Sequence, residues 1–326
     1  MLYQPKDLLP YAHGCIGLSR YEERDFFSRF DEKQIAYYSA EHEDFDLRAH
    51  SSSGTRIKFV TAQREISFLY RIAAHNVWVQ DGIDILENGE RVAYYPPNLT
   101  KEETKVSYTR KADGPSEIEI CLPNGEIFLP YDFDLGEITP VPRKERFILF
   151  YGDSVVHSCH TKNPSYGWAR MIADEFEAEY LNRGVGAYSF DVGSLPEKPD
   201  FSPDLVFIEY GQNDMCHYET TEDGMAAADA YFAKIKSLYP NAKFLFITPD
   251  FVGPDGSNEK ERQVMPEYCE GYRRLCEKYN IPLLEGSEMM DYDHENYCSD
   301  LVHFSEQGIA LFAKNLIAEI KERNLI

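Results

Sequence analysis

The stretch Phe147-Ile-Leu-Phe-Tyr-Gly-Asp-Ser154 decides the fold of the second half of the chain. Its first five residues are all apolar or aromatic, a pattern typical of a strand that is buried on both faces of a parallel sheet. The small Gly152 lets the chain turn sharply where this strand ends. We therefore expect Ser154 at the carboxyl edge of a parallel sheet, which is where such sheets carry their active sites.

Strand and helix patterns alternate from this stretch to the end of the chain. Further strands are expected at Leu205–Tyr210, Phe244–Thr248 and Ile281–Leu284, and helices near residues 166–180, 225–238, 259–279 and 305–321. This alternation predicts a parallel sheet with helices on both faces.

The first 145 residues have a different pattern of polar and apolar residues. Thr55–Val60 and Glu65–Ile72 alternate polar and apolar residues, as half-buried strands do. The pattern continues at Val77–Val79, Ile83–Leu86 and Ile118–Leu122. Asn88-Gly89 lies between apolar runs and predicts a hairpin. Short strands separated by turns predict a β-sandwich or jelly roll.

A segment rich in proline and charged residues, Ile138–Arg146, separates the two parts of the chain that show these different patterns. Its prolines resist helix formation and central-strand pairing, and its charges keep it in water. We therefore expect a β-sandwich domain at residues 1–145 and an α/β domain at residues 146–326.

Composition limits the classes of partner. The formal net charge of −23 repels nucleic-acid phosphates and anionic lipid, so neither nucleic acid nor a membrane is an expected partner. The beginning of the sequence lacks the apolar core of a signal peptide, and the seven scattered cysteines favour reduced thiols. A cytoplasmic protein is expected, and a homo-oligomer is possible.

Two motifs far apart in the sequence supply a nucleophile and a base. Asp300 and His303 lie three residues apart, so one turn can bring the carboxylate to the imidazole Nδ1. That contact fixes the tautomer and leaves Nε2 to take a proton from the Ser154 hydroxyl. Each motif alone has an ordinary explanation, since Ser154 suits a helix cap and His303 the surface. The prediction depends on their combination.

Two further motifs follow predicted strands. The segment Gly211–Asp214, Gly-Gln-Asn-Asp, comes directly after a strand, and the Asn213 side-chain amide can donate to an oxyanion. The segment Asn182–Ala187, Asn-Arg-Gly-Val-Gly-Ala, contains small residues that allow backbone N–H groups to face a pocket. Turns between strands and helices favour the same residue types, so each motif alone is weak evidence. Four such motifs in order indicate a hydrolytic site.

These four motifs resemble the ordered blocks of the SGNH (GDSL-type) serine hydrolases, over residues 147–322. The resemblance implies a flavodoxin-like three-layer α/β/α fold and ester hydrolysis through an acyl-enzyme, without a cofactor. It implies that Ser154 is the nucleophile and, through its backbone N–H, the first oxyanion donor. It also implies a side-chain donor in Asn213, a base in His303 and an orienting carboxylate in Asp300.

The second block departs from the family pattern. The family has a glycine where this chain has Ala187, with Gly186 just before it. A backbone donor needs no particular side chain, so Ala187 and Gly186 both remain open as the second amide of the oxyanion hole. His157 and His160 follow Ser154 at helical spacing and can be imagined as metal ligands. Because triad hydrolysis needs no ion, we expect no metal and place both histidines beside the pocket.

The first half carries a fainter resemblance. His50–Thr61 and Asp81–Leu86 resemble the amino-terminal β-domain of two-domain SGNH proteins of the GxDLY-associated group. The Gly82–Leu86 stretch departs from that signature at its last two positions. Related two-domain architectures occur among carbohydrate acetyl esterases.

The sequence therefore predicts a serine esterase that removes a short acyl group, acetyl above all, from a carbohydrate or another small polar alcohol. Two alternatives stay open. An acyltransferase would use the same triad and pass the acyl group to an alcohol other than water. A non-catalytic carbohydrate-binding protein would use the fold alone.

Overall fold

The computed structural model describes residues 2–75 and 81–326, so the strand predicted at Val77–Val79 lies outside the described residues. The chain divides into two compact units near the predicted boundary, and a short segment that follows Ser154 belongs to the first unit. The first unit extends to Lys144 and includes Thr161–Gly167; the second comprises Glu145–His160 and Trp168–Ile326.

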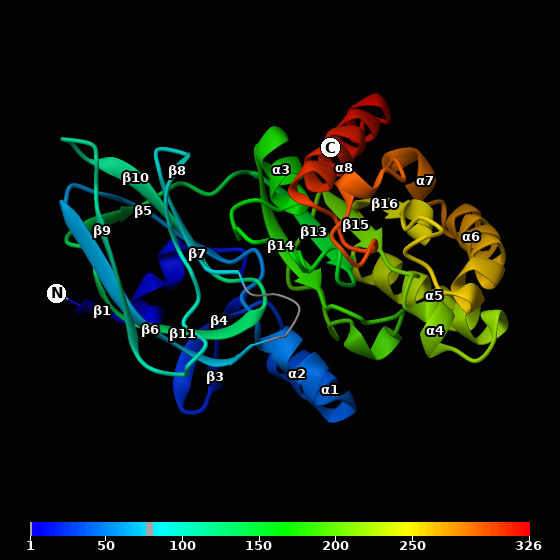
Figure 1. Cartoon of the computed structure of the whole chain (residues 1–326), viewed down its shortest axis with the longest axis horizontal. Coiled ribbons are helices and arrows are strands. Elements are labelled where there is room, and N and C mark those ends of the chain that lie inside the picture. Colours follow the sequence, from blue (N-terminus) through cyan, green and yellow to red (C-terminus); the bar gives the residue numbers. More distant parts are fainter. Residues whose placement is uncertain (1, 76–80) are drawn as a thin grey trace. The chain divides into compact units, whose positions relative to one another are not determined.

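The first unit consists mainly of antiparallel strands (Figure 1). They are β1 (Leu2–Tyr3), β2 (Ala12–His13), β3 (Gly17–Tyr21), β4 (Arg24–Ser28), β5 (Arg56–Thr61), β6 (Glu65–His75), β7 (Ile83–Glu87), β8 (Glu90–Tyr95), β9 (Thr104–Thr109), β10 (Ser116–Cys121), β11 (Glu126–Asp134) and β12 (Ile138–Pro140). One sheet has the order β1-β11-β6-β9; the other has the order β12-β5-β10-β7-β8, with β2 paired to β5. Strands β3 and β4 form a separate hairpin.

Side chains from both sheets share one apolar core, as a β-sandwich requires. Along β6, Ile66 and Phe68 are buried with the other alternate residues, and Phe68 stacks on Phe133 of β11 with ring centroids 5.0 Å apart. The predicted hairpin is confirmed. Asn88 and Gly89 connect β7 to β8 with φ angles of 54° and 83°, the left-handed values that this two-residue turn needs.

Three helical segments that the alternation did not indicate accompany these strands: η1 (Pro5–Tyr11), α1 (Glu32–Glu41) and α2 (Glu43–His50). Asp31 caps α1 by accepting the Gln34 backbone N–H at 2.8 Å. The predicted linker is also shorter than expected, because Ile138–Pro140 pairs with β5 as an edge strand. An edge strand tolerates proline where a central strand does not.

The second unit contains one parallel sheet and its helices. Its strands are β13 (Arg146–Gly152), β14 (Ala178–Gly184), β15 (Leu205–Glu209), β16 (Lys243–Ile247) and β17 (Leu283–Leu284). Its helices are α3 (Trp168–Glu175), α4 (Asp214–His217), α5 (Thr221–Leu238), α6 (Glu259–Tyr279), α7 (Gly286–Met289) and α8 (Glu306–Glu322), with 3-10 segments η2 (Val192–Ser194), η3 (Pro249–Phe251) and η4 (His294–Asn296). The strand order is β14-β13-β15-β16-β17.

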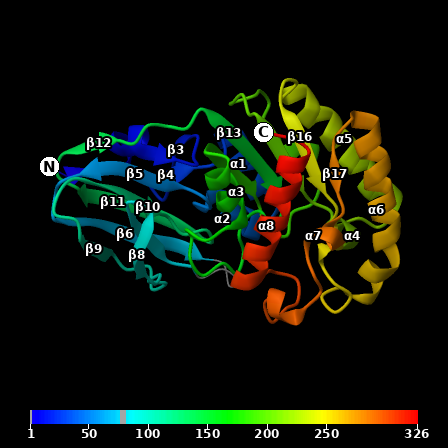
Figure 2. The ribbon, with the colours of Figure 1, turned by 90° about the horizontal axis from the view of Figure 1, so that it is seen from above.

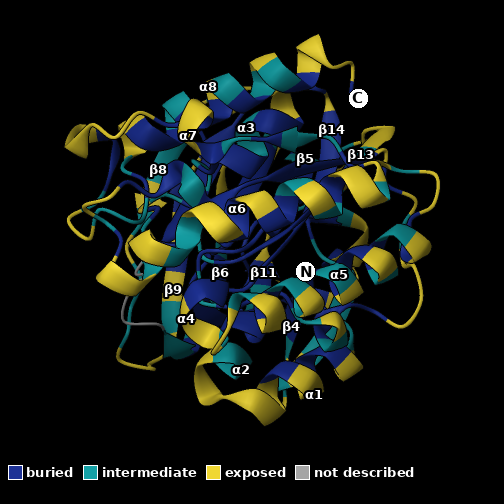
Figure 3. Ribbon diagram, turned by 90° about the vertical axis from the view of Figure 1, so that its right-hand side faces the viewer, coloured by how far each residue is buried: buried dark blue, intermediate teal, exposed yellow. Residues whose placement is uncertain are grey.

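Helices cover both faces of this sheet (Figure 2). On one face, Phe207 of β15 packs against Trp168 of α3, which in turn contacts Phe312 of α8. On the other face, Phe246 of β16 packs against Phe232 of α5 and against α6. The outward sides of α6 and α8 are exposed (Figure 3). The three-layer α/β/α prediction is therefore confirmed.

One predicted boundary is wrong. The helix expected to reach residue 180 ends at Glu175, and Ala178 begins β14. Glu177 has a left-handed φ of 49°, which cannot continue a helix and turns the chain into the strand. None of the helices in the described parts of the chain is both long and apolar enough to cross a membrane.

Candidate active site

The strand order places the predicted site at a switch point of the second unit's sheet. From β13 the chain adds β14 on one side and then returns to add β15 on the other. The carboxyl ends of β13 and β15 diverge there, and ligands of doubly wound sheets bind in that crevice. Ser154 follows β13 by two residues and Asn213 follows β15 by four, so both lie at this edge.

Close packing shapes the turn that carries Ser154. A Cβ atom at Gly152 would lie 2.3 Å from Val156 Cγ2 and 2.4 Å from the Glu209 carbonyl oxygen, so no side chain fits there. A Cβ atom at Gly184 would lie 2.2 Å from the backbone nitrogen of His157. The residues after Ser154 form successive turns instead of the helix that their spacing indicated.

The Ser154 hydroxyl is half-buried and donates to Asp153 Oδ1 at 3.4 Å. Asp153 is buried, and its carboxylate also accepts the Val155 backbone N–H at 3.1 Å. The role of Asp153 was not predicted, because it was recognised only as part of the motif that contains Ser154. A carboxylate in a buried turn needs hydrogen-bond donors, and that requirement was the available signal.

Asp300 and His303 form the predicted pair. His303 Nδ1 lies 2.8 Å from Asp300 Oδ2. Asp300 Oδ1 accepts the backbone N–H groups of Val302 and His303, each at 3.0 Å, in a turn where Leu301 has a left-handed φ of 58°. Burial alone would raise the pKa of Asp300, but the hydrogen bonds from His303 and the two amides outweigh it and lower the pKa. Asp300 therefore stays a carboxylate.

The turn after Ser154 reaches this pair. His160 Nε2 lies 3.4 Å from Asp300 Oδ2, and the rings of His160 and His303 are 4.5 Å apart. His160, six residues after Ser154, therefore contacts both members of the Asp300–His303 pair. The Ser154 hydroxyl and the His303 imidazole are not hydrogen-bonded to each other. His303 Nε2 is shielded from solvent and has no hydrogen-bond partner among the described residues.

The two candidate amides of the oxyanion hole differ in their partners. The Gly186 N–H donates to His157 Nδ1 at 3.1 Å, so it is already engaged. Within residues 2–75 and 81–326, neither the Ser154 amide nor the Ala187 amide has an acceptor. Ala187 has a left-handed φ of 58°, which costs energy for a residue with a Cβ.

Asn213 is hydrogen-bonded to the residue that precedes Ser154. Its side-chain amide donates to Asp153 Oδ2 at 2.7 Å and, over a longer 3.3 Å, to the Tyr188 carbonyl oxygen. The short bond connects the loop after β15 to the loop after β13. Asn213 therefore holds the Asp153 carboxylate in place. Its longer hydrogen bond, to the Tyr188 carbonyl oxygen, is the weaker of the two, so a stronger acceptor such as an oxyanion can replace that carbonyl.

Three buried acids lie beneath the site: Asp153, Glu209 and Asp214. Burial raises the pKa of all three, and the proximity of Asp153 further raises the pKa of Glu209 and Asp214. Asp214 reaches a pKa of about 8, and its Oδ1 accepts the Phe190 backbone N–H at 3.1 Å. With a pKa of about 8, Asp214 is therefore mostly protonated near neutral pH.

Comparison with known families identifies this unit. The model of the GDSL-like lipase/acylhydrolase family matches residues 150–311, which contain all four motifs. Residues 150–311 belong to this family. A comparison with curated protein sequences found no match.

Several solved structures share the fold. A salicylyl-acyltransferase, SsfX3, from a tetracycline biosynthetic pathway is 16% identical, with a TM-score of 0.85 over 100% of this chain and 98% of its own. A putative GDSL-like lipase from Bacteroides ovatus is 14% identical, with a TM-score of 0.81 over 99% and 97%. A family two carbohydrate esterase from Clostridium thermocellum is 17% identical, with a TM-score of 0.65 over 85% and 94%.

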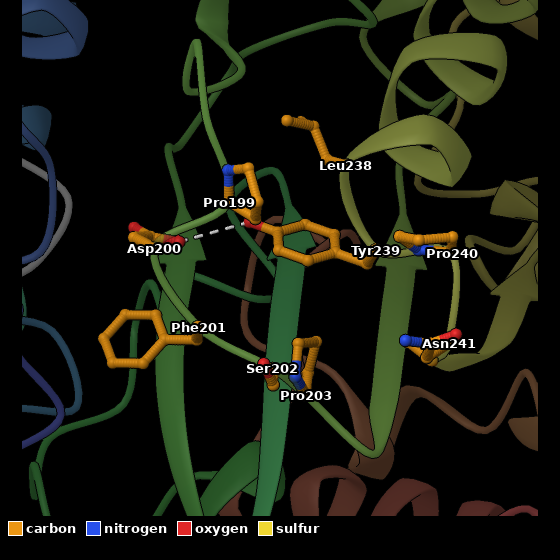
Figure 4. Close-up of a pocket in the computed structure, with 10 residues that line it drawn as sticks. Pro199, Asp200, Phe201, Ser202, Pro203, Leu238, Tyr239, Pro240 and Asn241 are labelled. Carbon is orange, nitrogen blue, oxygen red and sulfur yellow. Dashed lines mark hydrogen bonds between the residues drawn. The ribbon is translucent and has the colours of Figure 1, made fainter.

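A cavity of about 480 Å³ also lies in this GDSL-like unit. Figure 4 shows that it is lined by residues 199–203 and 238–242, the segments that lead into β15 and β16. Asp200 accepts a 3.3 Å hydrogen bond from Tyr239 there and also pairs with the buried Arg183. None of the predicted catalytic residues lines this cavity.

Proposed function

We propose that the chain is a serine esterase that works through an acyl-enzyme on Ser154. The observation that carries this proposal is the Asp300–His303 pair, 2.8 Å apart, with the His303 Nε2 atom unpartnered among the described residues and the nucleophile turn beside it. A neutral imidazole held at Nδ1 by a carboxylate is a general base at Nε2.

The proposed reaction begins when the Ser154 side chain rotates from Asp153 toward His303. The hydroxyl proton passes to Nε2 as Oγ attacks the ester carbonyl carbon, and Asp300 stabilises the imidazolium. The amides of Ser154 and Ala187, with the Asn213 side chain, hold the oxyanion. Nε2 then protonates the leaving alcohol, and water repeats the sequence to release the acid and free Ser154.

The proposed substrate is a short acyl ester, above all an acetyl ester, of a carbohydrate or another small polar alcohol. The similarity to a family two carbohydrate esterase supports this class. The net charge of −23 also suits a neutral or cationic substrate better than an anionic one.

A second candidate is acyl transfer with the same residues. The similarity to the salicylyl-acyltransferase, which extends over the whole chain, favours it. Hydrolysis and transfer differ only in whether water or another alcohol attacks the acyl-enzyme. Mass spectrometry of the products formed with candidate acceptor alcohols separates them. A non-catalytic carbohydrate-binding role is the third reading, and it requires that Ser154 be unreactive.

Turnover of para-nitrophenyl acetate tests the proposal. The unmodified protein should hydrolyse it, and Ser154→Ala should fall to the background rate because no other hydroxyl replaces the nucleophile. Ser158→Ala, which removes a nearby hydroxyl of the same turn, is the matched control and should retain turnover. Equal rates in the unmodified protein and Ser154→Ala would exclude Ser154 as the nucleophile.

A further inference from the structure

The two histidines after Ser154 have separate environments. His157 is buried and its Nδ1 accepts the Gly186 N–H. His160 instead turns outward to the edge where Asp300 lies. Its left-handed φ of 64°, which follows a φ of 67° at Ser158, sets this direction. Such conformations persist where the surrounding structure requires them and are frequent at functional sites.

His160 joins a cluster that is larger than the predicted pair. One nitrogen from each of His160 and His303 and one oxygen of Asp300 lie within 4.8 Å of one another. Both imidazoles face the same carboxylate oxygen, Asp300 Oδ2, with His303 Nδ1 at 2.8 Å and His160 Nε2 at 3.4 Å. The base and its carboxylate do not need this second imidazole for proton transfer.

The spacing fits a small transition-metal ion. Zinc binds imidazole nitrogen and carboxylate oxygen at about 2.0–2.2 Å, so neighbouring ligand atoms of a tetrahedral site lie roughly 3.4 Å apart. The His160–Asp300 separation already has this value, and the His303–Asp300 separation needs to widen by about 0.6 Å. The side chains of Asp300 and His160 are 36% and 27% exposed, so an ion can reach them from solvent.

We propose that His160, Asp300 and His303 form an inhibitory site for zinc and related divalent transition metals. The inhibitory half of this proposal rests on the esterase function proposed above. Zinc takes the Nδ1 lone pair of His303, so the proton that Nδ1 carried moves to Nε2. An imidazole with Nε2–H cannot accept the Ser154 proton. The bound ion therefore prevents His303 from acting as a base, although it does not contact Ser154. Water occupies the fourth coordination position of the ion.

The donor set also defines which ions bind. Two imidazole nitrogens and one carboxylate oxygen suit zinc, cobalt, nickel and copper. Magnesium and calcium prefer sets of oxygen ligands, so they should not compete. The acidic surface of the chain attracts all divalent cations, which makes magnesium the control for a general charge effect.

Metal binding is measured first, without catalysis. Titration of Ser154→Ala with cobalt should give the intense visible absorption of a tetrahedral site with nitrogen ligands, and calorimetry with zinc should give one tight site. His160→Gln should weaken zinc binding at least about 10-fold. His217→Gln removes an exposed histidine outside the cluster and should leave that site unchanged. Equal zinc affinity in His160→Gln and the unmodified protein would overturn the site.

Inhibition is measured second, with each variant compared with its own metal-free rate. Micromolar zinc should inhibit para-nitrophenyl acetate turnover by the unmodified protein, and a chelator should restore it. His160→Gln should need at least about 10-fold more zinc for the same fractional loss. Magnesium at the same concentration should have no effect. Zinc inhibition that is identical in both proteins would refute the assignment even if Ser154 is confirmed as the nucleophile.

Discussion

Each unit of this chain buries a pair of neighbouring carboxyl groups, and the two pairs have different hydrogen-bond partners. In the β-sandwich unit the pair is Asp81 and Glu126; in the GDSL-like unit it is Asp153 and Glu209. Burial raises the pKa of all four groups, with Asp81 at about 7, and the neighbouring aspartate raises the pKa of Glu126 and of Glu209 further.

The partners of the two pairs differ. Asp81 accepts the backbone N–H groups of Asn124 and Gly125, at 2.8 Å and 3.2 Å, and so holds a loop between β10 and β11. Asp153 accepts one backbone amide and two side-chain donors, the Ser154 hydroxyl and the Asn213 amide. A buried carboxyl pair therefore holds a loop in one unit and contacts the proposed nucleophile, Ser154, in the other. Substitutions in the two pairs should separate stability from catalysis.

The largest effect is expected from removing the Asn213 side chain, whose amide contacts the Asp153–Glu209 pair. Asn213→Ala removes the short hydrogen bond to Asp153 and a proposed oxyanion donor. We expect kcat to fall by about 10²–10³-fold, the usual cost of losing one such donor. Steady-state kinetics checks this. Asn124→Ala, an amide beside the other pair, should leave kcat unchanged, and a loss of the same size there would remove the distinction.

The next effect concerns stability in the β-sandwich unit. Asp81→Ala removes the carboxylate that accepts the buried Asn124 N–H and one of the two carboxylates that accept the Gly125 N–H, the other being Glu126 at 3.2 Å. The free energy of unfolding should fall by about 1–3 kcal/mol, because unsatisfied buried donors are costly. Chemical denaturation measures this, and kcat of the folded variant should be that of the unmodified protein. A large loss of kcat would show that the pair acts in catalysis.

A smaller effect on kcat is expected from a substitution at Asp153. Asp153→Asn keeps the size of the side chain but removes the charge that orients the Asn213 amide. A hydrogen bond to a charged group contributes roughly 1.5 kcal/mol, so kcat should fall about 10-fold. KM should change little, since the substrate does not touch this buried group. A KM effect without a kcat effect would contradict the positioning role.

The smallest effect is a difference in pH dependence. The ordinary pKa of an aspartate is 3.8, whereas the folded pKa values of Asp81 and Asp214 are about 7 and about 8. The folded state therefore binds protons that the unfolded state has released. The stability that they contribute is full below about pH 4 and declines as pH rises through the folded pKa, by roughly 1 kcal/mol per pH unit for each group.

Asparagine substitutions at Asp81 and Asp214 separate the pH ranges over which the two groups change the stability. Between pH 7 and 8 the contribution of Asp81 levels off while that of Asp214 still declines, so Asp214→Asn should make the stability profile less steep there and Asp81→Asn should not. Chemical denaturation at half-unit pH intervals measures both profiles. A wild-type stability that rises from pH 6 to 8, with the same slope in Asp214→Asn, would contradict the raised pKa of Asp214.

Most of the second unit could be predicted from its sequence, because buried parallel strands have a simple pattern. The apolar run at Phe147–Tyr151 and the helix at Glu259–Tyr279 lie where expected. The end of α3 could not be located, since a left-handed residue such as Glu177 leaves no mark in the hydrophobic period. In the first unit the capped helices after Asp31 were missed, although Gln34 three residues later is a capping signal.

The candidate site was predicted as motifs but not as a network. The sequence places Ser154, Asn213 and His303 at turns, and the topology brings these turns to one edge. The bonds between side chains depend on packing that no local pattern encodes. The Asn213 amide was predicted only as an oxyanion donor, whereas in the structure it donates to Asp153. His160 was set aside as a metal ligand because triad hydrolysis needs no ion, yet the turns after Ser154 bring it into contact with Asp300.

Labelling with a fluorophosphonate probe tests the central claim most directly, because the probe reacts only with a serine that a base has activated. We predict one covalent adduct, mapped by peptide mass spectrometry to Ser154. The rate of labelling should fall by at least about 10²-fold in His303→Gln, since a positioned base contributes at least this much. An adduct elsewhere, no adduct, or an unchanged rate in His303→Gln would contradict the account.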